Sequence, residues 1–252
     1  MLNIGWFSTG RDKAARQLLQ TVQDSIRSGD INGEISFVFS NRGPGESKES
    51  DMFFELVQSY NIRLVCLSHK EFKTTKNQNE WRIKYDREVN KKIKSFACDV
   101  CVLAGYMLIV SEELCKRHDM INLHPAPPGG PAGSWQQVIW ALIDSKADAA
   151  GAMMHVVTPE LDKGPVVSYC LFSIKGEPFA EYWRKDDRNT LFQLIRQREL
   201  AREFPLITFT LQSLSRGEVS VKEQKVIDAQ GRPISGYDLT KQVDEKVKKL
   251  LK

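Results

Sequence analysis

The chain has 252 residues, of which 41% are hydrophobic and 27% are charged. This apolar content is enough for the core of one large domain or two small ones, and it excludes an intrinsically disordered chain. The net charge is +4, but basic and acidic residues are interspersed. The charge therefore favours anionic small molecules weakly and does not indicate a nucleic-acid partner. No apolar run reaches about 18 residues and the N-terminus does not resemble a signal peptide, so we expect a protein without a membrane partner.

Cysteine usage indicates reduced thiols and a cytoplasmic location. The five cysteines are odd in number and lie mostly in apolar, strand-like runs: Cys66, Cys98, Cys101, Cys115 and Cys170. Cys98 and Cys101 form a C-x-x-C pair, but strand alternation places them on opposite faces, and no second pair completes a zinc site. We therefore expect these two side chains to be core residues and predict no metal site.

The first part of the chain alternates short β-rich runs with amphipathic stretches. The predicted strands are 3–7, 34–40, 63–67 and 97–106, and the predicted helices between them are 12–27, 48–60 and 79–95. This alternation predicts an α/β fold, with a Rossmann-like, mostly parallel sheet flanked by helices. In such sheets, ligands bind at the carboxyl ends of the strands near a topological switch point.

The second part adds strands at 120–124, 150–157 and 166–174, with a helix at 134–145 for which Ser134 is the predicted N-cap. A long helix is expected at about 187–213. A hairpin turning at "DAQGRP" and a tail helix from residue 237 follow. Leu239, Val243, Val247 and Leu250 share one face of that helix, which indicates packing on its own domain or on a twin subunit. We predict a catalytic domain at 1–217, with the hairpin and helix at 218–252 packed on it.

Three polar side chains lie where such a sheet keeps its active site. Alternation along "INLH" places Asn122 and His124 on one face of a strand end, and Asp162 follows in the loop "TPELDKGP". Each feature alone is more often structural, as a satisfied polar pair or a turn-forming aspartate. Together they supply an amide donor, an imidazole able to carry a proton and a carboxylate to hold it protonated. This set suits acyl transfer to an amine.

Four segments in order carry a resemblance to a known family: "VLAGYMLIV", "INLHPAPPGGPAG", "GAMMHVVTPELDKGPVV" and "RELAREFPLI". They resemble the successive motifs of the folate-dependent formyltransferases, and the phosphoribosylglycinamide formyltransferase branch in particular. The similarity runs from about residue 1 to about residue 237. It implies a Rossmann-like enzyme of purine biosynthesis. The enzyme would transfer a formyl group from 10-formyltetrahydrofolate, its co-substrate, to the primary amine of a phosphorylated acceptor such as phosphoribosylglycinamide.

The resemblance also implies which positions form the site. The family's catalytic residues fall on Asn122, His124 and Asp162. Its pterin pocket falls on Tyr106, Met107, Leu108, Ile109, Val110 and Leu161. Its acceptor site falls on Ser8, Thr9, Gly10, Arg11, Arg82 and Glu199. Arg82 is included because it stands three residues before "YDRE", at the family's phosphate-binding arginine.

The sequence departs from the family pattern at several of these positions. Arg11 and Lys13 replace small residues of a glycine-rich phosphate loop, so side-chain charge can stand in for backbone N–H groups. Leu108 replaces an arginine, and Glu199 is displaced by one residue relative to Phe204. The loop "HPAPPGGPAG" also differs from the family's usual "HPSLLP". These departures leave the acceptor less well defined than the family.

The expected mechanism needs no covalent enzyme intermediate, because the amine itself is the nucleophile. Asn122 would donate to the oxyanion, His124 would act as imidazolium, and Asp162 would raise the pKa of His124, with His155 in support. Two alternatives stay open: a formyltransferase for another amine such as an amino sugar, and a non-catalytic relative that binds folate or phosphate. A homodimer is also left open.

Overall fold

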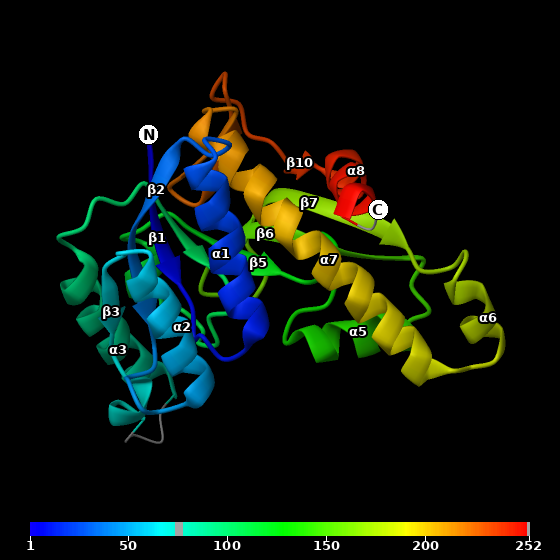
Figure 1. Cartoon of the computed structure of the whole chain (residues 1–252), viewed down its shortest axis with the longest axis horizontal. Helices are drawn as coiled ribbons and strands as arrows, with labels where there is room; N and C mark the ends of the chain where they lie inside the picture. Colours follow the sequence, from blue (N-terminus) through cyan, green and yellow to red (C-terminus); the bar gives the residue numbers. More distant parts are fainter. Residues whose placement is uncertain (74–77, 251–252) are drawn as a thin grey trace.

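The computed structural model describes residues 1–73 and 78–250 and contains one large twisted sheet with helices packed on it (Figure 1). The sheet strands are β1 Leu2–Phe7, β2 Gly33–Ser40, β3 Leu64–Cys66, β4 Val100–Leu103, β5 Met120–His124, β6 Ala149–Val156, β7 Val166–Ser173 and β10 Tyr237–Asp238. The hairpin strands are β8 Val219–Lys222 and β9 Lys225–Asp228. The helices are α1 Lys13–Arg27, α2 Lys48–Ser59, the 3₁₀ turn η1 His69–Glu71, α3 Gln78–Ile93, α4 Glu112–Cys115, α5 Trp135–Asp144, α6 Phe179–Arg184, α7 Arg188–Ser215 and α8 Thr240–Leu250.

The described part of the sheet has eight strands in the order β10-β7-β6-β5-β4-β1-β2-β3. The pairs β3-β2-β1-β4-β5 are all parallel, whereas β6 runs antiparallel to both β5 and β7. The chain leaves β1 for β2 on one side and later returns to place β4 on the other side. This reversal between β1 and β4 is the topological switch point, where ligands bind outside the carboxyl ends. The predicted mostly parallel sheet is therefore confirmed.

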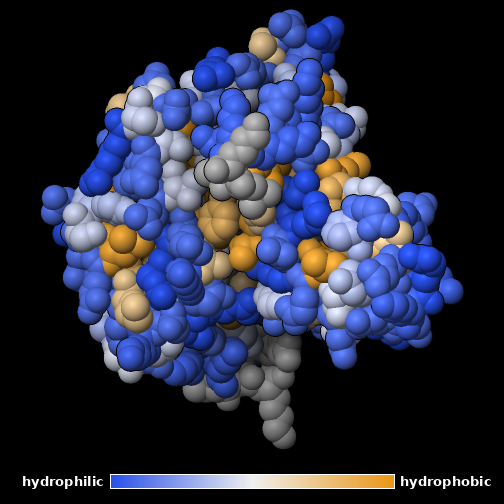
Figure 2. Space-filling model, turned by 45° about the vertical axis from the view of Figure 1, so that its right-hand side comes forward, coloured by the Kyte–Doolittle hydropathy of each residue, from blue (hydrophilic) through white to orange (hydrophobic). Residues whose placement is uncertain are grey.

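The surface of the described residues carries few large hydrophobic side chains. None of their helices has the length and apolar character that crossing a bilayer requires. The face in Figure 2 is mostly hydrophilic, with hydrophobic residues gathered in a few separate patches. Two of the four large hydrophobic side chains that are exposed, Met107 and Leu161, belong to the predicted pterin pocket.

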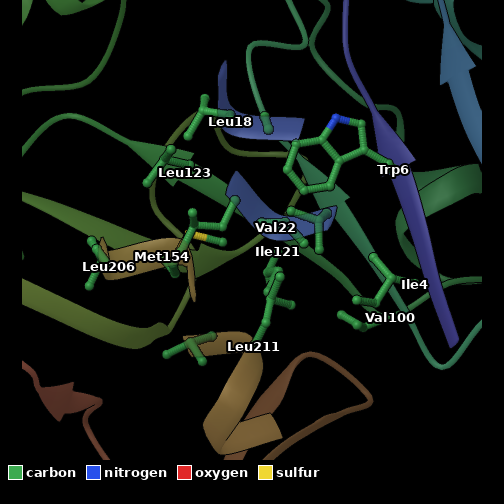
Figure 3. Packing of buried hydrophobic residues seen from close by; sticks show 14 of the residues in the cluster. Ile4, Trp6, Leu18, Val22, Val100, Ile121, Leu123, Met154, Leu206 and Leu211 are labelled. Atoms are coloured by element: carbon green, nitrogen blue, oxygen red, sulfur yellow. The ribbon is translucent and has the colours of Figure 1, made fainter. Parts of the chain in front are cut away.

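Strand alternation sends successive side chains of the sheet into different cores. Ile4 and Trp6 of β1 join a cluster with α1 and α7, whereas Phe7 joins a second cluster with α3. Figure 3 shows the first cluster, in which side chains of α1 (Leu18, Val22) and α7 (Leu206, Leu211) surround those of the sheet. The same cluster takes in buried residues of the C-terminal hairpin, of α8 and of the position just before α8: Val219, Val221, Val226, Leu239, Val243 and Val247. The C-terminal segment thus shares the core of the main sheet.

Local signals account for the start of α5. The hydroxyl of Ser134 accepts a hydrogen bond from the N–H of Gln137, while the side chain of Gln137 accepts one from the N–H of Ser134. This reciprocal arrangement satisfies two helix N-terminal donors and confirms Ser134 as the N-cap. It also fixes where the proline- and glycine-rich loop after β5 ends.

The predicted C-terminal hairpin and tail helix are present, but the predicted position of the turn and the predicted start of the helix are wrong. The hairpin turns at Glu223 and Gln224, both in the left-handed region with φ of 50° and 61°, and "DAQGRP" forms a second turn after β9. These residues lack the Asn-Gly signature of such a turn, so no local pattern predicts its position. The tail helix begins at Thr240 rather than 237, because Tyr237–Asp238 pairs as β10 with β7 and Asp238 then accepts from the N–H of Thr240.

Candidate active site

A cavity of about 380 Å³ opens at the carboxyl ends of β1, β4 and β5. Its walls come from the loops that follow these strands, from the loop between β6 and β7, and from α1, α5 and α7. Nine of the predicted site residues line it: Arg11, Tyr106, Met107, Leu108, Ile109, Asn122, His124, Leu161 and Asp162. The cavity therefore lies at the switch point and brings together residues from distant parts of the chain.

Strand β5 carries two of the three polar side chains on one face. Asn122 pairs with His155 across the antiparallel β5-β6 ladder, and the amide Nδ2 of Asn122 lies 3.1 Å from Nε2 of His155. Nδ1 of His155 donates to the carbonyl of Val156 at 2.9 Å. When His155 is neutral, its Nε2 therefore accepts from Asn122, which orients the amide and leaves the second N–H of Asn122 available.

His124 is 3% exposed, and its Nε2 lies 3.0 Å from the carbonyl oxygen of Pro131. A carbonyl only accepts, so Nε2 carries the proton and Nδ1 is the basic nitrogen of the neutral ring. Nδ1 lies 3.7 Å from Oδ2 of Asp162. The basic edge of the imidazole thus faces the carboxylate.

Asp162 reaches the histidines because its loop turns sharply. Its φ of 54° is in the left-handed region, which aspartate tolerates better than most residues, and its Oδ2 accepts from the N–H of Gly133 at 2.9 Å. Oδ1 lies 3.5 Å from Nε2 of His155. Gly164 is required at the base of this loop, because a Cβ there would stand 1.8 Å from the carbonyl oxygen of Val156.

Burial sets the charge state of the free site. It lowers the pKa of His124, although the Pro131 carbonyl and the carboxylate of Asp162 act in the opposite direction. Burial also opposes ionisation of Asp162, but His155 and the Gly133 N–H outweigh it and lower the pKa of Asp162. Asp162 is therefore ionised and His124 neutral at neutral pH. Asp162 does favour the imidazolium, but burial has the larger effect on the pKa of His124 in the free site, so the role predicted for Asp162 stays a prediction.

The loop after β4 forms the apolar wall. Met107 and Leu161 are each 46% exposed at its edge, whereas Tyr106 is buried against Phe7. The hydroxyl of Thr9 accepts from the N–H of Met107 at 2.9 Å and so ties this loop to the loop after β1. Val110 lies behind the wall and faces a neighbouring cavity.

The predicted acceptor residues do not all reach the cavity. Arg11 lines it, whereas Ser8 and Thr9 are buried beneath and Gly10, with φ of 62°, packs against Phe53. Arg82 lines the neighbouring cavity with Val110. Glu199 is fully buried inside α7, away from the cavity wall.

Sequence reasoning missed Arg196 and Glu203, which line the cavity from α7. Nη1 of Arg196 lies 2.6 Å from Oε1 of Glu203, and the guanidinium stands 4.5 Å from the ring centroid of Trp135. The spacing of seven residues, two helical turns, places both side chains on one face of the helix. This spacing is the sequence pattern that could have identified Arg196 and Glu203. The family's glutamate motif, displaced here by one residue, predicted Glu199 instead.

The buried carboxyl of Glu199 leads to a stability prediction. Burial and the neighbouring Glu203 raise its pKa well above the ordinary value, although Arg196 lies 3.6 Å away and acts in the opposite direction. Between the unfolded pKa, about 4.3, and the raised folded pKa, folding must take up a proton, so the free energy of unfolding falls as pH rises. We expect Glu199→Gln to remove this loss of about 1.4 kcal/mol per pH unit.

Urea unfolding of the wild type and of Glu199→Gln at pH 5 and pH 8 measures this effect. The variant should gain stability relative to the wild type on going to pH 8. If the free energy of unfolding changes equally for both proteins between the two pH values, Glu199 ionises as easily in the folded protein as in the unfolded chain.

Comparison with known proteins identifies the family of this chain. The sequence model described as formyl transferase matches residues 13–177, which include β5 and the loop of Asp162. The chain belongs to the formyl transferase family. Among the described residues of this formyl transferase, no group of three His, Cys, Asp or Glu side chains is arranged to hold a metal ion.

Relatives of known name are similar over most of the chain. A phosphoribosylglycinamide formyltransferase of Dictyostelium discoideum is 30% identical over 59% of this chain and 74% of its own. One from Haemophilus influenzae is 25% identical over 87% of this chain and 92% of its own. The solved structure of the Coxiella burnetii phosphoribosylglycinamide formyltransferase has the same fold, with a TM-score of 0.73 at 21% identity over 94% of this chain and 98% of that chain.

Proposed function

We propose that this formyl transferase moves a formyl group from 10-formyltetrahydrofolate to the primary amine of phosphoribosylglycinamide, a step of purine biosynthesis. The observation that carries the proposal is the convergence of Asn122, His124 and Asp162 on one cavity at the switch point. The choice of phosphoribosylglycinamide as the acceptor is supported by the names of the Dictyostelium discoideum and Haemophilus influenzae relatives.

Asn122 is proposed to stabilise the oxyanion that develops when the amine attacks the formyl carbon. Its amide is held by His155, at 3.1 Å, and by the rigid β5-β6 ladder. A donor fixed before the reaction needs no reorganisation as charge develops, and such donors contribute strongly in a cavity with little water. The second N–H of Asn122 is available for this role.

His124 is proposed to take the proton that the amine loses. Nδ1 carries the lone pair of the neutral ring, and it faces Asp162 at 3.7 Å. The lowered pKa of His124 keeps its ring neutral, so Nδ1 can accept a proton. The imidazolium that then forms is attracted by the carboxylate of Asp162. Asp162 thus stabilises the imidazolium during the reaction rather than before it.

The apolar wall is proposed to hold the pterin ring of the donor. Met107, Leu108 and Ile109 of the loop after β4 and Leu161 of the loop between β6 and β7 line the cavity, and two of the four, Met107 and Leu161, are unusually exposed for large hydrophobic residues. An exposed apolar wall with few polar groups suits a flat heterocycle, whose edge can then bond to backbone groups. Leu108 offers no charge to the donor.

Arg11 is proposed to bind the acceptor phosphate. It stands next to the N-cap of α1, Asp12, and its Nε lies 3.3 Å from a carboxylate oxygen of that residue. The helix N-terminus and the guanidinium both favour an anion there. A location in the cytoplasm completes the proposal. Sedimentation analysis of the purified chain tests the homodimer, which the sequence leaves open.

Formyl transfer with a panel of amines tests the function. Purified protein and 10-formyltetrahydrofolate should give product fastest with phosphoribosylglycinamide, and more slowly with its dephosphorylated form or an amino sugar. Preference for the amino sugar would move the assignment to that acceptor. Calorimetric binding of the folate without transfer to any amine would identify a non-catalytic relative, and formate release without an acceptor would identify a hydrolase.

A further inference from the structure

The two cysteines of the C-x-x-C segment face each other at the beginning of β4. Their Sγ atoms are 3.4 Å apart, contrary to the expectation that they occupy opposite faces of a strand. The reason is a bend at Asp99, which precedes the strand. The bend is fixed by β1, because the N–H of Asn3 donates to the carboxylate of Asp99 at 2.7 Å and the carbonyl of Asn3 accepts from the N–H of Asp99 at 2.8 Å.

The two thiols differ in access. Cys98 is partly exposed, whereas Cys101 is fully buried between β1 and β5. The hydrogen bond from Cys101, with further ones from the backbone N–H groups of Gly5 and Val100, lowers the pKa of Cys98. The same contact and burial raise the pKa of Cys101. Cys98 is thus partly accessible and has a lowered pKa, whereas Cys101 is buried and in contact with it.

Gly5 of β1 lies directly against the thiol of Cys98. A Cβ on Gly5 would lie 3.0 Å from Sγ of Cys98 and 2.6 Å from the ring of Phe37. The pair also lies at the amino end of β4, whereas the loop at its carboxyl end lines the substrate cavity. Chemistry at the thiols therefore takes place at the edge of the sheet opposite to formyl transfer.

The remaining cysteines provide a contrast. Burial raises the pKa of Cys66 to about 11, and those of Cys115 and Cys170 to about 12. Because the thiolate is the nucleophile in disulfide exchange, these three thiols react slowly at neutral pH. Any selective oxidation of the protein should therefore begin at Cys98.

We propose that Cys98 and Cys101 form a reversible redox site that reacts with low-molecular-weight disulfides. The Cys98 thiolate attacks one sulfur of the small disulfide, forming a mixed disulfide and releasing one thiolate. Cys101 then loses its proton and attacks Sγ of Cys98, forming the Cys98–Cys101 bond and releasing the second thiolate. The protein loses two electrons and two protons, and the small disulfide becomes two thiols. The sulfurs need to approach from 3.4 Å to about 2.05 Å, a movement within reach of side-chain rotation.

Peptide mapping after exposure to oxidised glutathione tests the proposal. After quenching and alkylation, cleavage before Asp99 separates Cys98 from Cys101, so a bond between them appears as two linked peptides. The peptide with Cys101 also holds Cys115, so the Cys115→Ser variant should keep the link and Cys101→Ser should lose it. Linked peptides should disappear again on addition of reduced glutathione. Absence of the link in folded wild-type protein, or its loss in Cys115→Ser, would overturn the proposal.

The order of the two steps gives a second, independent readout. In Cys101→Ser the mixed disulfide cannot be resolved, so glutathione should accumulate on Cys98 as an adduct seen in the intact mass. In Cys98→Ser neither the adduct nor the link should form at a comparable rate. Equal modification of Cys98 and Cys170 in the wild type would contradict the selectivity on which the site depends.

Discussion

Replacing Asn122 by alanine is expected to lower kcat by about 10² to 10³, the usual loss when one oxyanion donor is removed. The amide is held by His155 at 3.1 Å and is the donor best placed for charge that develops in the cavity. Because Asn122 belongs to the polar end of β5 rather than to the apolar clusters, the variant should unfold at nearly the wild-type temperature. Steady-state kinetics of formyl transfer and a thermal melt measure the two effects.

The Asn122→Asp variant is the matched control, because it keeps the size of the side chain and replaces the donating amide by an accepting carboxylate. Its loss of kcat should be at least as large as that of Asn122→Ala, since a negative charge would face the oxyanion. If Asn122→Asp keeps wild-type kcat, Asn122 positions β6 and does not act on the reacting atoms.

Replacing Arg11 by alanine is expected to raise the KM for the phosphorylated acceptor about 10- to 100-fold, since a hydrogen bond to a charged group contributes about 1.5 to 3 kcal/mol. The KM for 10-formyltetrahydrofolate should stay nearly constant, and the preference for the phosphorylated acceptor over its dephosphorylated form should fall. Arg11 lines the cavity beside the N-terminus of α1, where a phosphate also meets the helix dipole.

Arg82→Ala is the matched control for Arg11→Ala, because it removes the same charge from the neighbouring cavity that Val110 lines. A smaller change in the acceptor KM is expected from this variant. If Arg82→Ala alone abolishes the phosphate preference, the acceptor phosphate lies in that neighbouring cavity, as the resemblance implies for Arg82. Two variants without effect would mean that the acceptor has no phosphate contact at either arginine.

The fold was predictable because its signals are local and repeated. The runs from "NIGWF" to "MINLH" alternate with amphipathic helices, and this pattern is enough to predict a mostly parallel sheet and its switch point. The placement of Asn122 and His124 on one face likewise follows from the period of a strand. The residue pattern also places Asp162 in a loop near these side chains, whereas its position depends on the positive φ and the bond from the N–H of Gly133.

What the sequence could not predict depends on contacts between distant residues. The bend that joins Cys98 to Cys101 is fixed by Asn3, which is 96 residues away from Asp99. The charge state of His124 depends on burial beneath the loop that ends at α5, and the amino acid pattern contains no measure of that burial. The turn at Glu223 requires a backbone conformation that these residues rarely adopt.

The short strand β10 has a consequence for solubility. Strand β7 is eight residues long, half of them are buried, and β6 occupies only one of its sides. Tyr237–Asp238 pairs with the other side, and the N–H of Leu239 then donates to the carbonyl of Tyr169, with α8 packed beyond. An uncovered β7 would present unpaired backbone groups along an apolar strand, which is a template for intermolecular pairing. Strand β10 and the start of α8 thus cover the edge of the sheet at which intermolecular pairing would otherwise begin.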